Sequence, residues 1–220
     1  MLPSGVTLLL GAVRRGWDPA AGGAPVFFNS LLVVDELGDV VDVYDKVRLV
    51  PFGEFLPLRP LLEAIGLRRL ASGTQDFAAG TLLRPLEAGG RAVLPLVCYE
   101  IIFPGLVRGL AERPDMIVNV TNDAWFGDTP GPHQHLRQAV VRAIETGMPV
   151  VRSANTGISA LVDPAGRTLA VLPLGAKGTI EGRVPPPLPP PVYAAVGDLP
   201  LLALLAAIAL AATALARRRA

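Results

Sequence analysis

The single cysteine of this chain, Cys98, is the residue whose type and place best suit nucleophilic chemistry. It ends a short apolar run, P-L-V-C-Y-E at residues 95–100, and Glu100 follows two positions later. An apolar run of this length that contains valine is typical of a buried strand, so the thiol would lie where the strand meets polar residues. A lone cysteine is more often a small buried hydrophobe than a catalyst, so this stretch alone favours a structural interpretation.

Two further blocks carry polar residues that could complete a site. One block, Y-D-K-V-R-L-V-P-F-G-E-F-L-P at residues 44–57, contains Lys46 and Glu54. The other, N-V-T-N-D-A-W-F-G at residues 119–127, follows an expected strand. Glu54 stands in an apolar loop, where an unpaired carboxylate would be costly. We therefore expect Glu54 to pair with Lys46, either as a structural ion pair or within the site.

A layered scaffold must position these blocks, and the hydrophobic pattern predicts one. Apolar runs bounded by turn residues predict strands, and a stretch with helical spacing and no breakers predicts a long helix. Strands are expected at residues 6–13, 26–35, 40–44, 92–98, 116–120, 149–152, 157–162, 168–171 and 178–184, and helices at residues 61–70, 103–113 and 133–146. Strands alternating with helices, together with hairpins, indicate an α/β layered domain.

Composition narrows the functional classes. The net charge of +1 provides no bulk attraction to nucleic acid, so no nucleic-acid partner is expected. One cysteine excludes an internal disulfide framework, and the sequence has no Cys/His cluster of the kind that binds zinc. We therefore expect neither a metal nor another cofactor.

The C-terminal end predicts a membrane span. Residues 199–216 read L-P-L-L-A-L-L-A-A-I-A-L-A-A-T-A-L-A without a charge, close to the roughly 20 apolar residues that cross a bilayer, and three arginines follow. Basic residues after a span predict a cytoplasmic C-terminus, with the preceding domain on the other side of the membrane. The prolines before the span predict a stiff spacer. The expected parts are a globular domain at residues 1–184, a proline-rich linker at 185–191, and the transmembrane helix with its basic tail at 192–220.

In this order, the lysine, cysteine and asparagine blocks resemble the nitrilase, or carbon–nitrogen hydrolase, superfamily. The cysteine block V-C-Y-E-I-I-F-P spans residues 97–104, and the third block is continued by H-L-R-Q-A-V-V-R-A-I-E at 135–145 and R-S-A-N-T-G-I-S at 152–159. More narrowly, the blocks are similar to the membrane-bound branch, the apolipoprotein N-acyltransferases, over nearly the whole chain. The resemblance implies an αββα sandwich, here N-terminally incomplete, followed by one transmembrane helix.

The resemblance also implies roles for individual residues. Members of the superfamily use a Glu–Lys–Cys triad, in which Lys46 matches the lysine and Cys98 the nucleophile. Glu54, Tyr99 and Glu100 match residues that line the acyltransferase site; Glu100 could instead cap the following helix, and Tyr99 could simply pack. The family's glutamate base lies before the lysine, and no carboxylate of this chain stands where that block should be. We therefore expect the triad glutamate to be absent, as in a C-terminal fragment.

The implied activity is acyl transfer at the bacterial inner membrane, with the catalytic domain on the periplasmic side. Cys98 would take an acyl chain from a membrane phospholipid as a thioester and pass it to the N-terminal amino group of a diacylglyceryl-cysteine lipoprotein. Two other hypotheses stay open. One is a soluble-type amidase of the same superfamily that acts on a small amide, and the other is an inactive truncated remnant.

The remaining polar and aromatic residues of these blocks have structural interpretations. Asn119, Asn122 and Asp123 are expected to be turn residues where a strand ends. Four further side chains are expected to pack or to order the site. Trp125 and Phe126 are expected in the local core, with contact to acyl chains as the alternative, His135 at a helix start, and Arg152 at the site floor.

Overall fold

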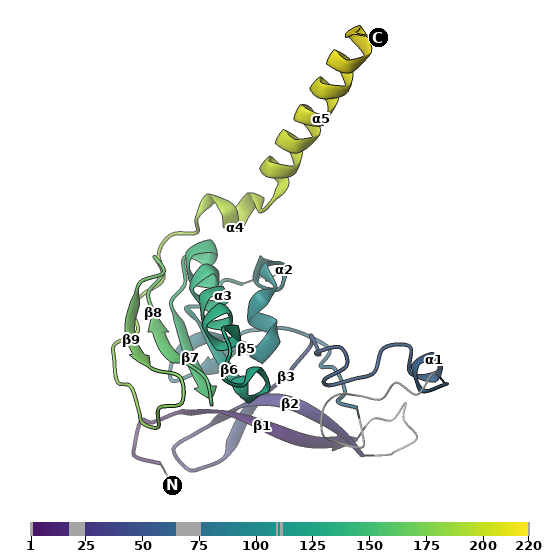
Figure 1. Cartoon of the computed structure of the whole chain (residues 1–220). Helices are drawn as coiled ribbons and strands as arrows, with labels where there is room; N and C mark the ends of the chain where they lie inside the picture. Colours follow the sequence, from purple (N-terminus) through teal and green to yellow (C-terminus); the bar gives the residue numbers. More distant parts are fainter. Residues whose placement is uncertain (1, 18–24, 65–75, 109, 111, 220) are drawn as a thin grey trace.

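Two β-sheets pack face to face in this protein, and helices cover the outer face of the larger sheet (Figure 1). The computed structural model describes residues 2–17, 25–64, 76–108, 110 and 112–219. The predicted α/β sandwich is confirmed. Within the described residues it consists of one helical layer and two sheets.

The smaller sheet is antiparallel, with the spatial order β1-β2-β3. Its strands are β1 (Leu8–Trp17), β2 (Pro25–Val34) and β3 (Val40–Asp45). The last two form the predicted hairpin, and at its turn Asp35 Oδ1 accepts hydrogen bonds from the N–H groups of Leu37 and Asp39, each at 2.9 Å. Directly after β3, the N–H of Lys46 donates to the carbonyl oxygen of Asn29 at 2.8 Å. The lysine block therefore begins anchored to β2.

The larger sheet has six strands that lie side by side in sequence order. They are β4 (Leu86–Ala88), β5 (Arg91–Val97), β6 (Met116–Asn122), β7 (Val150–Asn155), β8 (Ser159–Val162) and β9 (Thr168–Leu172). Strands β5, β6 and β7 are parallel, and the other pairings are antiparallel. The carboxyl ends of the three parallel strands therefore meet at one edge of the sheet, and polar residues cluster there.

Strand β5 is buried on both faces, which explains its continuous apolar run. Leu94 and Leu96 face the helices, whereas Val93 and Val97 face the smaller sheet, where Leu31, Val33 and Tyr44 complete the core between the sheets. The helical layer consists of α2 (Pro104–Arg108) and α3 (Gly131–Thr146). Alternate side chains of β5 therefore belong to the two hydrophobic cores of the domain, one on each face of the larger sheet.

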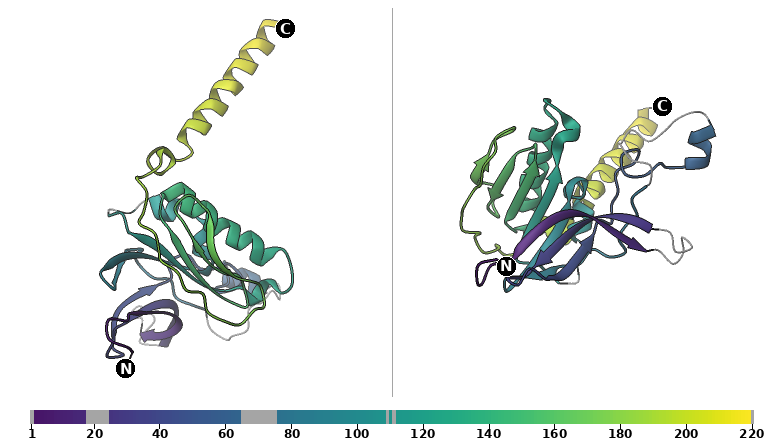
Figure 2. Two further views of the ribbon diagram at one scale, coloured as in Figure 1. Left: turned by 90° about the vertical axis from the view of Figure 1, so that its left-hand side faces the viewer. Right: turned by 90° about the horizontal axis from the view of Figure 1, so that it is seen from below.

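A long apolar helix projects away from the sheets at the C-terminus, as Figures 1 and 2 both show. This helix, α5 (Leu199–Arg219), follows the short α4 (Val192–Val196). Its segment Leu199–Arg217 has a mean hydropathy of 2.4, and none of it is buried in the protein. Gly197, with a φ of +56°, makes the turn between the two helices. Among the described residues it is the one helix long and apolar enough to cross a membrane.

The proline-rich segment before α4 is bound to the domain. The N–H of Leu188 donates to the carbonyl oxygen of Gly147 at 2.8 Å, and Arg113 Nη2 donates back to the carbonyl oxygen of Leu188 at 2.6 Å. The start of the apolar helix is therefore held close to the end of α3.

Several expected element boundaries differ from the structure. The strand expected at residues 178–184 is absent, although its Gly182 lies directly against Leu161 of β8. The short strand β4 was not predicted, because three residues show no periodicity. The helix expected at residues 61–70 begins as α1 (Arg59–Ala64), and its remainder lies outside the described residues, as do residues 109 and 111 of the helix expected at 103–113.

Candidate active site

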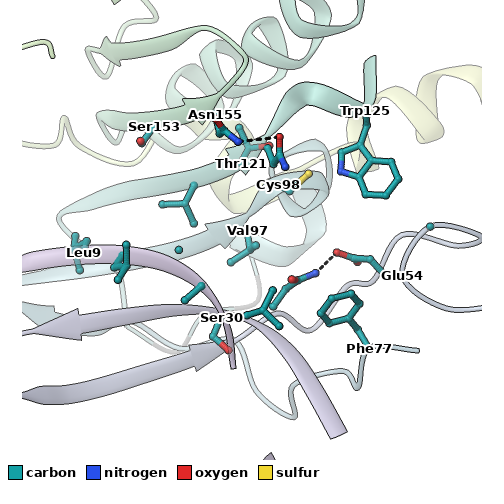
Figure 3. Close-up of a pocket in the computed structure, with 18 residues that line it drawn as sticks. Leu9, Ser30, Glu54, Phe77, Val97, Cys98, Thr121, Trp125, Ser153 and Asn155 are labelled. Atoms are coloured by element: carbon teal, nitrogen blue, oxygen red, sulfur yellow. Dashed lines mark hydrogen bonds between the residues drawn. The ribbon is translucent and has the colours of Figure 1, made fainter. Parts of the chain in front are cut away.

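Cys98 stands where β5 ends and the short 3-10 helix η2 (Cys98–Ile102) begins. Its φ is +53°, in the left-handed region that non-glycine residues rarely adopt. Such a backbone breaks the alternation of the strand, and Cys98 lines a cavity at the margin of the core between the sheets (Figure 3). Backbone strain of this kind is held in place by surrounding contacts, and it is common where a side chain must be presented for chemistry.

The cavity in front of Cys98 lies between the two sheets and has a volume of about 590 Å³. Strand β1 forms one wall with apolar side chains, and the ends of β6 and β7 form another with polar ones. Three side chains from other segments complete it, as Figure 3 shows: Glu54, Phe77 and Trp125. The cavity thus combines apolar walls with a thiol and a carboxylate.

Lys46 and Glu54 form the expected ion pair. Lys46 Nζ lies 2.8 Å from Oε1 and 2.9 Å from Oε2 of Glu54, and the lysine side chain is fully buried. Glu54 also accepts hydrogen bonds from the Asn29 side chain and, at 2.7 Å, from the N–H of Val50. Glu54 lines the cavity and Lys46 does not, so the lysine is linked to the cavity through its carboxylate partner.

Glu100 ties the lysine block to the cysteine strand. Its Oε1 accepts from the Tyr44 hydroxyl at 2.7 Å and from the N–H groups of Val47 and Arg48 at 2.8 and 3.0 Å. Its Oε2 accepts from the N–H of Val97 at 2.8 Å, in a capping arrangement at the start of η2. Glu100 therefore caps the short helix that contains it and not the helix expected at residues 103–113, and its other three hydrogen bonds reach Tyr44, Val47 and Arg48 in the lysine block. Burial raises the pKa of Glu100, against the opposing effect of these hydrogen bonds.

Tyr99 does not line the cavity in front of Cys98. It lines a neighbouring cavity of about 540 Å³, where its ring meets Phe103 edge to face with centroids 4.8 Å apart. Phe77 lines both cavities. The structure therefore gives Tyr99 a packing contact next to the site and brings Cys98 and Glu54 together without it.

Beneath Cys98 lies a buried polar network that the sequence did not predict. Arg152 donates through Nη2 to Asp123 Oδ2 at 2.6 Å and through Nη1 to the Asn119 side-chain oxygen. His135 Nδ1 lies 2.8 Å from Asp123 Oδ1, which also accepts from the Thr121 hydroxyl at 3.0 Å. The expectation that Asn119 is a turn residue is wrong, because Asn119 lies within β6 and is fully buried. Asp123 does lie where β6 ends, as expected, but its side chain is fully buried.

The charge of Asp123 is stabilised within this network. Burial opposes its ionisation, but the hydrogen bond with His135 and the charge of Arg152 outweigh burial and hold the pKa of Asp123 below its usual range. Gly157 packs against the same carboxylate, where a Cβ would lie 2.6 Å from Oδ2. Asn122 behaves as expected: it caps the short 3-10 helix η3 (Asp123–Phe126) by accepting from the N–H of Ala124 at 3.1 Å.

Trp125 and Phe126 are not core residues, contrary to expectation. Trp125 is 64% exposed and Phe126 is 41% exposed. Trp125 stands at the cavity, and Phe126 contacts the ring of His135 edge-on. Asn29 was missed altogether, although an asparagine within the apolar run V-F-F-N-S-L-L-V-V is a signal that could have identified it.

Comparison with known proteins places this geometry in a family. Residues 4–188 match the family described as Carbon-nitrogen hydrolase. The apolipoprotein N-acyltransferase of Bradyrhizobium diazoefficiens is 50% identical over 220 residues, which are all of this chain and 40% of the relative. That of Brucella melitensis is 47% identical over 190 residues, 86% of this chain and 36% of the relative. The chain therefore spans about two fifths of the length of these curated relatives.

Solved structures show the same fold. An amidase of the nitrilase superfamily from Nesterenkonia AN1 has a TM-score of 0.52 at 25% identity, covering 77% of this chain and 59% of that one. A carbon–nitrogen hydrolase from Helicobacter pylori has a TM-score of 0.55 at 16% identity, covering 76% of this chain and 58% of that one. The second likeness concerns the fold alone.

Proposed function

The chain belongs to the carbon–nitrogen hydrolase family, and from this premise we propose that it carries the acyl-transfer site of an apolipoprotein N-acyltransferase. One observation carries the proposal. The only thiol of the chain opens onto an apolar-walled cavity shared with the carboxylate of a buried lysine–glutamate pair. A 50% identity to such an enzyme across all 220 residues supports the choice of acyl transfer over other reactions of the family.

In the first half-reaction, the Cys98 thiolate attacks the ester carbonyl of a membrane phospholipid. The new C–S bond forms a thioester, the C–O bond of the ester breaks, and the lysophospholipid leaves with a proton. The apolar wall formed by Leu9, Leu10 and Val13, together with Phe77 and Trp125, suits the hydrocarbon chain that Cys98 would then carry.

In the second half-reaction, the N-terminal amino group of a diacylglyceryl-cysteine lipoprotein attacks the thioester. The C–N bond forms, the C–S bond breaks, and the thiol is regenerated with a proton from the amine. We assign Lys46 to stabilising the oxyanion of both tetrahedral intermediates through the positive charge of its ammonium group, which lies directly behind the Glu54 carboxylate at the cavity. Glu54 then orients Lys46.

The proton of the Cys98 thiol needs an acceptor, and the described residues that line the cavity offer no free carboxylate. Among the described residues that line it, Glu54 is the only carboxylate, and its two oxygens already accept from Lys46, Asn29 and Val50. We propose further that none of the carboxylates of this chain is the glutamate base implied by the superfamily. We therefore expect the isolated chain to form little or no thioester when it is incubated with phosphatidylethanolamine.

A graft tests the function directly. This chain would replace the 220 matching residues of the Bradyrhizobium diazoefficiens enzyme, and mass spectrometry would follow N-acylation of a lipoprotein N-terminus. We expect an active graft and complete loss of acylation in its Cys98→Ala variant. An inactive graft that accumulates like the parent enzyme, or an active Cys98→Ala graft, would refute the proposal. Efficient thioester formation by the isolated chain would instead refute the argument about the base.

The membrane placement is proposed on the sequence and exposure of α5. We propose that Leu199–Arg217 spans the bacterial inner membrane, with Arg217 and the arginines after it in the cytoplasm and the catalytic domain on the periplasmic side. A green fluorescent protein fused to the C-terminus of the graft should fluoresce, and alkaline phosphatase fused there should be inactive. The reverse result would show the opposite orientation.

The runner-up is a small-amide hydrolase, favoured by the likeness to the Nesterenkonia AN1 amidase. The exposed apolar face all around α5 argues against it, because a soluble enzyme has no use for such a surface.

The parts proposed remain a catalytic domain at residues 1–184, a linker at 185–191 and a membrane segment at 192–220; the family match ends within that linker.

A further inference from the structure

His135 is a buried titratable residue that the proposed chemistry leaves without a role. It lies in α3, is 5% exposed, and its Nε2 stands 3.2 Å from the carbonyl oxygen of Cys98. A carbonyl oxygen accepts hydrogen bonds and donates none, so this contact is a hydrogen bond only when Nε2 carries a proton. The other ring nitrogen decides whether that condition is met.

Nδ1 of His135 has two neighbours, one that accepts hydrogen bonds and one that donates them. Asp123 Oδ1 at 2.8 Å would accept a proton from Nδ1, whereas Arg152 Nη2 at 3.1 Å would donate one to it. If Nδ1 accepts from Arg152, the neutral ring carries its proton on Nε2. We assign this tautomer, because the Cys98 carbonyl beside Nε2 can only accept a hydrogen bond and Arg152 beside Nδ1 can only donate one.

The imidazole is held firmly enough to act as a fixed donor. Its partners Asp123 and Arg152 form an ion pair at 2.6 Å with both side chains fully buried, and Arg152 Nη1 is bound to Asn119 in β6. Phe126 contacts the ring from the side, with centroids 5.8 Å apart. Through these contacts, β6 and β7 fix the orientation of the imidazole ring and therefore the position of Nε2.

The backbone around Cys98 is thereby fixed on both sides. On the N-terminal side, Glu100 Oε2 accepts from the N–H of Val97. On the C-terminal side, His135 Nε2 donates to the Cys98 carbonyl. Between these contacts lies the left-handed φ of +53°, which is unfavourable for a cysteine and persists only where its surroundings enforce it.

From this geometry we infer that His135 is a positioning residue for the nucleophile: its Nε2–H holds the carbonyl group of Cys98, and with it the left-handed backbone from which the thiol enters the cavity. The inference deepens the proposed function, since it rests on Cys98 being the nucleophile. Asp123 and Arg152 serve it by fixing the ring.

Two substitutions separate the two ring nitrogens. In His135→Gln the side-chain amide can reach the place of Nε2 and still donate to the Cys98 carbonyl, but it loses the contact with Asp123. In His135→Asn the amide takes the place of Nδ1 and keeps Asp123, but it loses Cys98. The exposed His133 on the same helix provides the control, His133→Asn.

The contact is read by NMR on the full 220-residue chain. Because Cys98 is the only cysteine, [1-¹³C]cysteine labels one carbonyl in the protein. We expect its resonance to move upfield in His135→Asn, when the hydrogen bond is lost, and to stay near its original position in His135→Gln and His133→Asn. An unmoved resonance in His135→Asn, or equal movement in both His135 variants, would overturn the inference.

The effect of the His135 substitutions on catalysis is measured as the acylation rate of the graft. The acylation rate should fall about tenfold to a hundredfold in His135→Asn, the cost expected of a displaced nucleophile, and less than about threefold in His135→Gln. Equal losses in the two variants would show a merely structural role and overturn the inference. An inactive unsubstituted graft would count against the proposed function, and the carbonyl resonance would still decide whether His135 holds Cys98.

Discussion

Replacing Glu100 by alanine is expected to lower the free energy of unfolding of the domain by about 3–5 kcal/mol. The carboxylate is fully buried and accepts four hydrogen bonds. Its loss would leave four donors without their partner, three of them backbone N–H groups: the Tyr44 hydroxyl and the N–H groups of Val47, Arg48 and Val97. An unsatisfied buried donor is among the costliest defects that a point substitution creates.

Replacing Glu100 by glutamine should fall between alanine and the unsubstituted protein. The amide oxygen can take over the three bonds of Oε1, but the NH₂ group then faces the N–H of Val97, donor against donor. Chemical denaturation in detergent micelles, followed by tryptophan fluorescence, measures the difference. The control is Glu87→Gln on the exposed side of β4, expected within about 0.5 kcal/mol of the unsubstituted protein. A Glu100→Ala protein as stable as this control would contradict the prediction.

Glu100 also shows where sequence reasoning stopped. The motif C-Y-E identified the residue, and its position after a strand made capping one of two open interpretations. The contacts with Val47 and Arg48 join segments about 50 residues apart, and the local pattern contains nothing about such partners. The function of Glu100 as a tie between the lysine block and the cysteine strand therefore emerged only from the fold.

The fold itself was predictable where periodicity was strong. Strand β5 was recognised because burial on both faces demands a continuous apolar run, and the hairpin of β2 and β3 because Asp35 and Gly38 form a clear turn. The expected strand at residues 178–184 failed because β-branched residues alone do not secure a pairing partner. Propensity describes a segment, whereas a strand exists only through its neighbour.

The polar network could not be derived for a similar reason. Asn119 and Arg152 lie on neighbouring parallel strands and share the α3 face, but a single sequence does not say which strands are neighbours. Polar residues at strand ends are usually turn residues, so the sequence pattern favours that interpretation. Only the adjacency of β6, β7 and α3 turns Asn119, Asp123, His135 and Arg152 into one cluster.

The buried pair of Lys46 and Glu54 yields the second large effect, and it should be asymmetric. In Glu54→Gln the fully buried ammonium of Lys46 loses its counter-charge, at an expected cost of about 3–5 kcal/mol. In Lys46→Met the carboxylate of Glu54 keeps its bonds from Asn29 and Val50 and remains partly exposed, so a cost of about 1–2 kcal/mol is expected. The double variant should be more stable than Glu54→Gln alone.

A double-mutant cycle on unfolding free energies measures this coupling. The matched control is the exposed pair of Arg84 and Asp42, whose cycle should give about 0–1 kcal/mol. Additive losses at Lys46 and Glu54, or a larger loss from Lys46→Met, would contradict the argument. In the graft, the two variants should rank the other way round in acylation activity. Lys46→Met should abolish acyl transfer although it is the more stable single variant, because stabilising an oxyanion requires the charge that Lys46 supplies. The two members of the ion pair would then have different roles. Glu54 would mainly stabilise the fold by neutralising the buried ammonium group of Lys46, and Lys46 would mainly serve acyl transfer through its positive charge.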